Sequence, residues 1–154
     1  MNILLLLFTT LASFGGISAS GVAPGNFSLS CTSINLRHGF FLGATCCRPV
    51  EDSDTDSAES ESDNQLDLTM CIGLDQVAGR MQWEVYGKFS NYCANCTLMV
   101  GGHEGHVLTC FCRPLVGGKG VVRSSLNLDE GITNDMGTLK CDGGMASSGD
   151  GHGL

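Results

Sequence analysis

The chain has 154 residues, 9 cysteines and a formal net charge of −8 at pH 7. Seven of the 16 acidic residues lie in the run EDSDTDSAESESD at 51–63, so the rest of the chain is nearly neutral. A nearly neutral chain has no basic stripe that could replace the counterions of a phosphate backbone, which argues against a nucleic-acid partner.

Residues 1–20 are typical of a secretory signal peptide. A nearly unbroken apolar run, Ile3 to Phe8, is followed by small residues that end at Ser20, in the order of an h-region and a cleavage site. The run is too short to span a bilayer stably. We therefore expect a secreted, extracellular protein that keeps no membrane segment after cleavage. Because the segment before the run has no Lys or Arg, a disordered or membrane-tethered N-terminus is the alternative.

The chain contains two copies of one pattern, at 25–83 and 87–141. Each copy opens with Gly-x-Phe-Ser-x-x-Cys, continues through an Arg-Pro pair, and ends with Leu-x-Leu-x-x-x-Ile before a glycine turn. A repeat of this length implies a pseudo-symmetric unit with paired ligand sites.

Short alternating or β-branched segments predict an all-β fold. In chain order we expect strands at 26–36, 41–46, 80–85, 96–100, 107–112 and 138–141, with glycines at the hairpin tips. The segments 66–72 and 126–132 predict single turns, of the 3₁₀ kind. The acidic stretch 51–64 is typical of a disordered, solvated loop, and the Gly- and Ser-rich tail 142–154 of a disordered end. The prediction is one compact domain over 25–141, built from two tandem repeats and stapled by disulfides.

Cysteines at this density behind an export signal are expected to be oxidised. The repeat alignment places Cys31 and Cys46 opposite Cys93 and Cys112, which predicts one bridge within each copy. It also places Ile34 and Ala44 opposite Cys96 and Cys110, so an apolar pair in copy one becomes a third predicted bridge in copy two. An antiparallel register favours these pairs over the crossed ones if a β-bulge lies between Cys93 and Cys96. The predicted disulfides are Cys31–Cys46, Cys93–Cys112, Cys96–Cys110 and, from the remaining cysteines, Cys71–Cys141, with Cys47 left as a free or intermolecular thiol.

Metal binding is the competing interpretation of the same cysteines. Cys93-x-x-Cys96 and Cys110-x-Cys112 have zinc-ribbon spacing, and His103 and His106 lie between them. The predicted export and the repeat favour disulfides, so we expect no metal and no cofactor.

The landmarks resemble those of cyanovirin-N homologues, of the secreted kind found in filamentous fungi. The resemblance rests on the following segments: Asn26-Phe27-Ser28 before Cys31, Leu66-Asp67-Leu68 before Cys71-Ile72-Gly73, Leu126-Asn127-Leu128-Asp129-Glu130, and Gly137-Thr138-Leu139-Lys140. It implies a β-fold in which strands of one repeat complete the half built by the other. It also implies a lectin, not an enzyme, that binds high-mannose or α-linked mannose glycans at one shallow site per half.

The resemblance implies two sets of sugar contacts. In the half formed by both chain ends, the polar candidates are Asn26, Ser30, Arg48, Asn134 and Asp135. Leu29, Cys47 and Met136 occupy contact positions beside them, and the first two stand where the family often has polar side chains. In the other half the candidates are Asp75, Lys88, Asn91, Arg113 and Tyr92, next to Leu74; Tyr92 is suited to stacking on a sugar face.

Two N-glycosylation sequons are present, at Asn26 and Asn95. A glycan on Asn26 would occlude the first sugar site. The family pattern leaves a monomer and a strand-swapped dimer open. Catalysis is poorly supported, because the acidic pair Asp129-Glu130 is replaced by Thr69-Met70 in copy one. The second interpretation is a secreted non-lectin interaction module that kept the fold and lost sugar binding.

Overall fold

The computed structural model describes residues 25–48, 60–100, 105–118 and 120–148. The expected signal peptide and parts of the acidic stretch and of the tail lie outside these residues. Within the described ranges every regular element is a β-strand or a single-turn 3₁₀ helix (η). No helix in this part of the chain has the length and hydrophobicity needed to cross a membrane.

The order of elements repeats, as the sequence predicts. The first copy contains η1 (Phe27–Leu29), β1 (Cys31–Arg37), β2 (Phe41–Cys47), β3 (Glu61–Asp67), η2 (Leu68–Met70), β4 (Ile72–Leu74) and β5 (Met81–Trp83). The second contains η3 (Phe89–Asn91), β6 (Cys93–Met99), β7 (Val107–Cys112), β8 (Val122–Asn127), η4 (Leu128–Glu130), β9 (Thr133–Asp135) and β10 (Thr138–Cys141). Two short strands follow, β11 (Gly144–Met145) and β12 (Ser147–Ser148).

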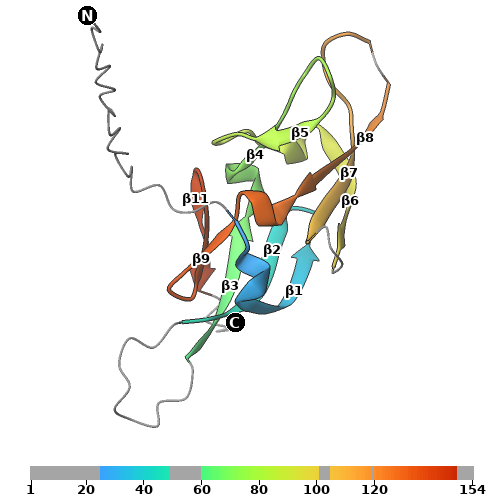
Figure 1. The fold of residues 1–154 in the computed structure, drawn as a ribbon. Helices are drawn as coiled ribbons and strands as arrows, with labels where there is room; N and C mark the ends of the chain where they lie inside the picture. Colours follow the sequence, from blue (N-terminus) through green and yellow to red (C-terminus); the bar gives the residue numbers. More distant parts are fainter. Residues whose placement is uncertain (1–24, 49–59, 101–104, 119, 149–154) are drawn as a thin grey trace, which may run out of the picture.

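The two copies exchange their last hairpins. In copy one β1, β2 and β3 form an antiparallel sheet with β12 at its edge, and in copy two β6, β7 and β8 form the corresponding sheet. The β9–β10 hairpin lies against β3, where the backbone N–H of Leu139 donates to Asn64 Oδ1 at 3.0 Å. The β4–β5 hairpin reaches β8, where the N–H of Met81 donates to Ser124 Oγ at 2.8 Å. We call β1–β3 with β9–β12 half A, and β6–β8 with β4–β5 half B (Figure 1).

Both long hairpins carry the predicted kind of β-bulge. In β6–β7 the register shifts between Ala94 and Thr97, which places Cys93 opposite Cys112. The β1–β2 hairpin shifts between Thr32 and Asn35 in the same way. The extra residue of each bulge, Ser33 or Asn95, has a φ of 52°. A bulge on β1 and on β6 also protects these edge strands against pairing with another chain.

The core combines apolar side chains with disulfides. The largest fully buried side chains include Phe27 and Phe89, at equivalent places in the two copies. All four predicted bridges are present: Cys31–Cys46, Cys71–Cys141, Cys93–Cys112 and Cys96–Cys110. The cysteines with zinc-ribbon spacing are therefore bonded to one another, and Cys47 is half-buried and outside any disulfide.

Several boundaries differ from the sequence predictions. The segment expected to be a solvated loop up to residue 64 becomes strand β3 at Glu61, because Asn64, Leu66 and Leu68 alternate toward the interior. The tail expected to be disordered from 142 supplies β11 and β12; the latter pairs with Gln65 and Asn64 and covers the outer edge of β3. The start of the strand expected at 26–36 is η1 with its caps Asn26 and Ser30, since Asn26 has a φ of 67° and Phe27 turns into the core. The 3₁₀ turns expected within 66–72 and 126–132 are η2 and η4.

Candidate functional site

A tight turn defines the end of half A. Asp135 pairs with Thr138 across the β9–β10 hairpin, which leaves Met136 and Gly137 as a two-residue connection. Their φ angles are 51° and 86°, and a type I′ turn requires positive φ at both central residues. Glycine accepts this conformation without steric cost, whereas methionine does not. The turn exposes Met136 and keeps Gly137 buried, in one fixed orientation.

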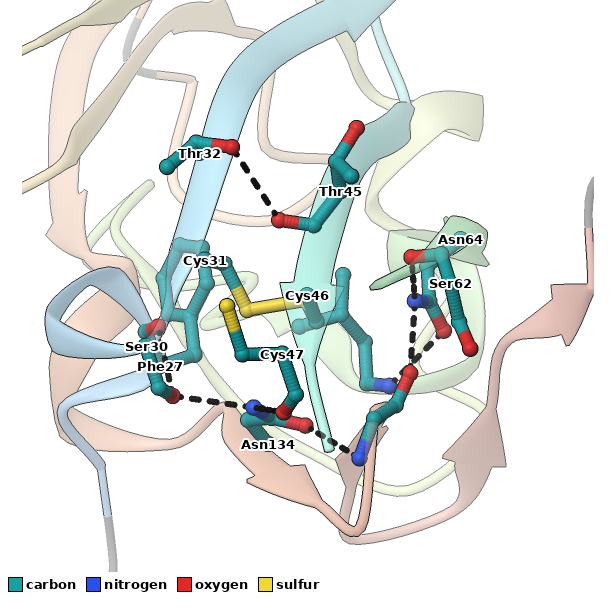
Figure 2. The surroundings of a disulfide bond; sticks show 12 residues. Phe27, Ser30, Cys31, Thr32, Thr45, Cys46, Cys47, Ser62, Asn64 and Asn134 are labelled. Carbon is teal, nitrogen blue, oxygen red and sulfur yellow. Dashed lines mark hydrogen bonds between the residues drawn. A yellow bond between two sulfur atoms is a disulfide. The ribbon is translucent and has the colours of Figure 1, made fainter. Parts of the chain in front are cut away.

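Asn134 joins this turn to the first repeat. Its Nδ2 donates to Ser30 Oγ and to the carbonyl oxygen of Cys47, both at 2.9 Å. Its Oδ1 accepts the N–H of Gly137 at 2.9 Å. Figure 2 shows this amide between the end of η1 and the end of β2, beside the Cys31–Cys46 disulfide. Three predicted contact positions, Ser30, Cys47 and Asn134, are therefore assembled into one surface.

Asn64 holds the same turn from below, and the sequence prediction missed it. Its Nδ2 donates to the carbonyl oxygens of Gly137 at 2.8 Å and Ser62 at 2.9 Å, while its Oδ1 accepts from Leu139. The side chain is 7% exposed. The sequence signal for Asn64 is its alternation with Leu66 and Leu68, which is typical of a strand. The acidic run directly before it resembles a loop and hides that signal.

Arg48 covers the turn from the solvent side. Its Nε donates to the carbonyl oxygen of Met136 at 3.2 Å, and its Cβ lies 3.4 Å from the place where a Cβ on Gly137 would be. The guanidinium is exposed at the rim of the surface. The guanidinium group has further N–H donors besides the Nε that Met136 accepts.

The two other candidates of half A lie differently. Asp135 forms an ion pair with Lys140, and strand alternation puts its side chain on the face of the hairpin opposite to Asn134. The structure therefore separates Asp135 from the Asn134 surface. Asn26 is exposed at the start of η1, and its backbone N–H donates to the carbonyl oxygen of Asp129 at 2.7 Å. Leu29, on the same turn, is 84% exposed.

Half B has a corresponding surface with a longer loop. Asp75 begins the loop between β4 and β5, and its Oδ1 accepts from Val77 N–H at 2.8 Å and Ala78 N–H at 3.0 Å. Gln76, which the sequence prediction missed, accepts the N–H of Leu115 on Oε1 at 2.9 Å. It plays the part that Asn134 plays in half A, because it ties the loop to the segment after the central strand. No sequence signal marks it, since the loops of the two halves differ in length.

The remaining candidates of half B lie along η3 and the end of β7. Lys88 precedes η3 with a φ of 50°, as Asn26 precedes η1. Tyr92 follows η3, packs against the core, and accepts the N–H of Arg113 on its carbonyl oxygen at 2.8 Å. The corresponding bond in half A joins Cys47 N–H to Ser30 at 3.0 Å. Asn91 and Arg113 are exposed beside this joint.

A buried carboxylate anchors η1 to the second repeat. Asp129 is 8% exposed and accepts the backbone N–H groups of Ser28 at 3.1 Å and His106 at 2.9 Å. His106 Nδ1 lies 3.3 Å from the same carboxylate. Burial acts to raise the pKa of Asp129, but the hydrogen bonds from Ser28 and His106 outweigh it and hold the pKa below its usual value. The carboxylate therefore stays ionised and fixes the base of half A.

Comparison with known proteins identifies the fold. The family model of the CVNH domain matches residues 27–140. The chain belongs to the CVNH family. CVNH proteins are cyanovirin-N homologues and form a lectin family, so the resemblance given by the sequence motifs is confirmed.

Solved CVNH structures share this fold. The NMR structure of GzCVNH from Gibberella zeae is 33% identical, covers 76% of this chain and 97% of its own, and superposes with a TM-score of 0.58. A MoCVNH3 variant (Mo0v) in complex with (N-GlcNAc)4 is 23% identical, with coverages of 79% and 99% and a TM-score of 0.58. The designed cyanovirin-N homologue lectin LKAMG is 24% identical, with coverages of 75% and 97% and a TM-score of 0.56. No curated protein sequence matches the chain.

Proposed function

We propose that this CVNH protein is a secreted lectin that binds mannose-type glycans through one shallow site in each half. The observation that carries the proposal is the convergence on Asn134, which joins η1, the end of β2 and a fixed turn into one polar surface. Gln76 builds the corresponding joint in half B. Two similar surfaces on a pseudo-symmetric lectin fold are suited to two branches of one glycan. No catalytic step is part of this proposal.

Recognition rests on hydrogen bonds to sugar hydroxyls. Asn134 and Asn64 use their amide groups within the protein and so position the surface. Arg48 then offers its remaining N–H donors to the sugar, and Ser30 Oγ its remaining acceptor position. Each such bond replaces one to water and contributes only about 1 kcal/mol. A single site is then expected to bind with about millimolar to micromolar affinity, roughly −4 to −8 kcal/mol. Linking both sites on one branched glycan adds about 10²–10⁴ in avidity.

Four disulfides support the extracellular part of the proposal, because such bonds persist in oxidising compartments. The Cys31–Cys46 bridge lies beside the Asn134 surface (Figure 2). An extracellular lectin also meets its glycans without crossing a membrane.

A second candidate function is a non-lectin interaction module. It is favoured by the apolar residues at contact positions of half A, since Leu29 is 84% and Met136 44% exposed. Such side chains suit a protein partner better than sugar hydroxyls.

An NMR titration with an α-linked mannose disaccharide separates the two functions. We expect saturable shifts of the Gly137 amide in half A and of the Leu115 amide in half B. Asn134→Ala is expected to abolish the first set and leave the second, and Gln76→Ala the reverse, so each variant is the matched control of the other. Unchanged spectra in both halves at millimolar sugar would reject the lectin and support the module.

A further inference from the structure

A hollow lies where the two repeats meet, away from the Asn134 surface. It measures about 340 Å³ and is lined by Trp83 from the first repeat and by Glu130, Gly131, Thr133, Lys140, Cys141 and Asp142 from the second. Thr133 and Lys140 face each other across β9 and β10, on the side of the hairpin opposite to Asn134. Cavities of this size at the junction of two structural units are typical of small-ligand sites. We call it the Trp83 pocket.

The wall of the pocket depends on a glycine. A Cβ at position 131 would lie 2.4, 2.5 and 2.6 Å from ring atoms Cε2, Cδ2 and Cζ2 of Trp83. Any side chain at this position would therefore displace the indole ring. Gly131 has a φ of −134°, so its place here is explained by this close approach and not by backbone conformation.

The contact between Trp83 and Gly131 is a point at which the two pseudo-symmetric halves differ. Gly131 follows η4 as Cys71 follows η2, and each is followed by an isoleucine, Ile132 or Ile72, at the start of an exchanged hairpin. Trp83 lies opposite Ile72 in the β4–β5 hairpin. Continuing the β9–β10 register by one residue puts Cys141 opposite Ile132, so Cys141 is the equivalent of Trp83. One of the two equivalent contacts is the Cys71–Cys141 disulfide, and the other is an indole on a glycine. The hollow lies between them, with Cys141 in its wall.

The chemistry of the lining favours a cation with an apolar body. Glu130 and Asp142 are exposed carboxylates at the rim, while the one basic residue of the lining, Lys140, is already paired with Asp135. The pocket therefore has unbalanced negative charge beside a partly exposed aromatic ring. Indole faces attract ammonium groups, and carboxylates provide charge-assisted acceptors for the same group. Trp83 Nε1 is in addition a buried donor without a hydrogen-bond partner in the described structure.

We propose that the Trp83 pocket is a third binding site of this protein, which takes a saccharide unit bearing a free amine. The ammonium group is held by Glu130 and Asp142, and the apolar face of the sugar ring lies against Trp83. This site does not depend on the two surfaces proposed for mannose-type glycans. It gives one chain the means to join a neutral glycan to an amino-sugar polymer.

Trp83 is the single tryptophan of the chain, so its fluorescence reports on this pocket directly. The titration is made at about pH 6, where such an amine is protonated. It uses the glucosamine disaccharide of chitosan, its N,N′-diacetyl form, and a simple aliphatic diamine. We expect a saturable change with the glucosamine disaccharide and binding at least about tenfold weaker for the other two, because one lacks the charge and the other the ring.

Glu130→Gln combined with Asp142→Asn is expected to weaken binding of the glucosamine disaccharide at least about tenfold, with an unchanged NMR fold signature, since both side chains are exposed. Glu61→Gln, which neutralises an exposed carboxylate on β3 outside the lining of the pocket, is the control and should leave the fluorescence titration unchanged. Equal binding of the diacetyl form, equal binding of the diamine, an unaltered double variant, or no saturable signal would each overturn the proposal.

Discussion

Asn64 offers the most direct test of how half A is held together. The substitution Asn64→Ala removes two donated bonds, to Gly137 and Ser62, and one accepted bond, from Leu139. Gly137 and Leu139 are buried, so their backbone groups cannot regain full hydration. At about 1 kcal/mol for each lost bond the variant should be about 3 kcal/mol less stable, and more if a buried group stays unsatisfied.

Urea unfolding with the disulfides intact measures this loss. With a slope of about 1–3 kcal/mol per molar urea, the midpoint should fall by about 1–3 M at unchanged slope. Ser124→Ala is the matched control in half B, because Ser124 occupies the equivalent place and accepts a single bond from Met81. It should cost only about 1 kcal/mol.

The same variants separate stability from sugar binding. Asn64→Ala should weaken mannose disaccharide binding in half A, because the Met136–Gly137 turn loses its support from below, and leave half B unchanged. If Asn64→Ala is no less stable than Ser124→Ala, the turn is not held by the amide and this account of half A is wrong.

Three further predictions concern other parts of the molecule. The lowered pKa of Asp129 stabilises the fold at pH values above its unfolded value of about 4, and this contribution is lost as pH falls through the folded pKa. Asp129→Asn should therefore make the free energy of unfolding depend less on pH in that range, and a pH dependence parallel to that of the unsubstituted protein would contradict this. Replacing Cys96 and Cys110 by Ile and Ala, the residues of copy one, should lower stability by about 3 kcal/mol in denaturant unfolding, and an unchanged midpoint would show that the bridge is redundant. Asn26→Gln, expressed in a secreting host, should increase glycan-array binding if a glycan on Asn26 covers half A, whereas identical arrays would reject that role for the sequon.

Residues that sequence reasoning interpreted wrongly share one property. Asn64 lies in an acidic run, and residues 144–148 lie in a Gly- and Ser-rich tail, so local composition predicts disorder for both. In the structure Asn64 in β3 pairs with Ser148 of this tail in β12, while Gly144 and Met145 pair with β10. Composition describes the average solubility of a segment. Strand formation here depends instead on pairing between segments far apart in the sequence, since β12 covers the edge of β3.

The candidate sites show the same division. Ser30, Arg48 and Asn134 could be predicted because motif positions carry them, and the structure assembles them. The sequence could not show that Asp135 lies on the other face of the hairpin, because its pairing with Lys140 follows from the register of β9 and β10. Gln76 could not be predicted because the β4–β5 loop is longer than the Met136–Gly137 turn, so the repeat alignment gives this position no equivalent.

The sequence alone determined the duplication, the all-β class, the four disulfides and the lone Cys47, because cysteine spacing and apolar periodicity are repeated in both copies. Tertiary structure decided which polar side chains meet. Asn64 reaches a carbonyl group 73 residues away, and Trp83 packs on a glycine of the other repeat. Such contacts depend on how the exchanged hairpins pack against the other repeat. A pair of cysteines can be recognised in the sequence, whereas a hydrogen bond or a ring contact leaves no pattern there.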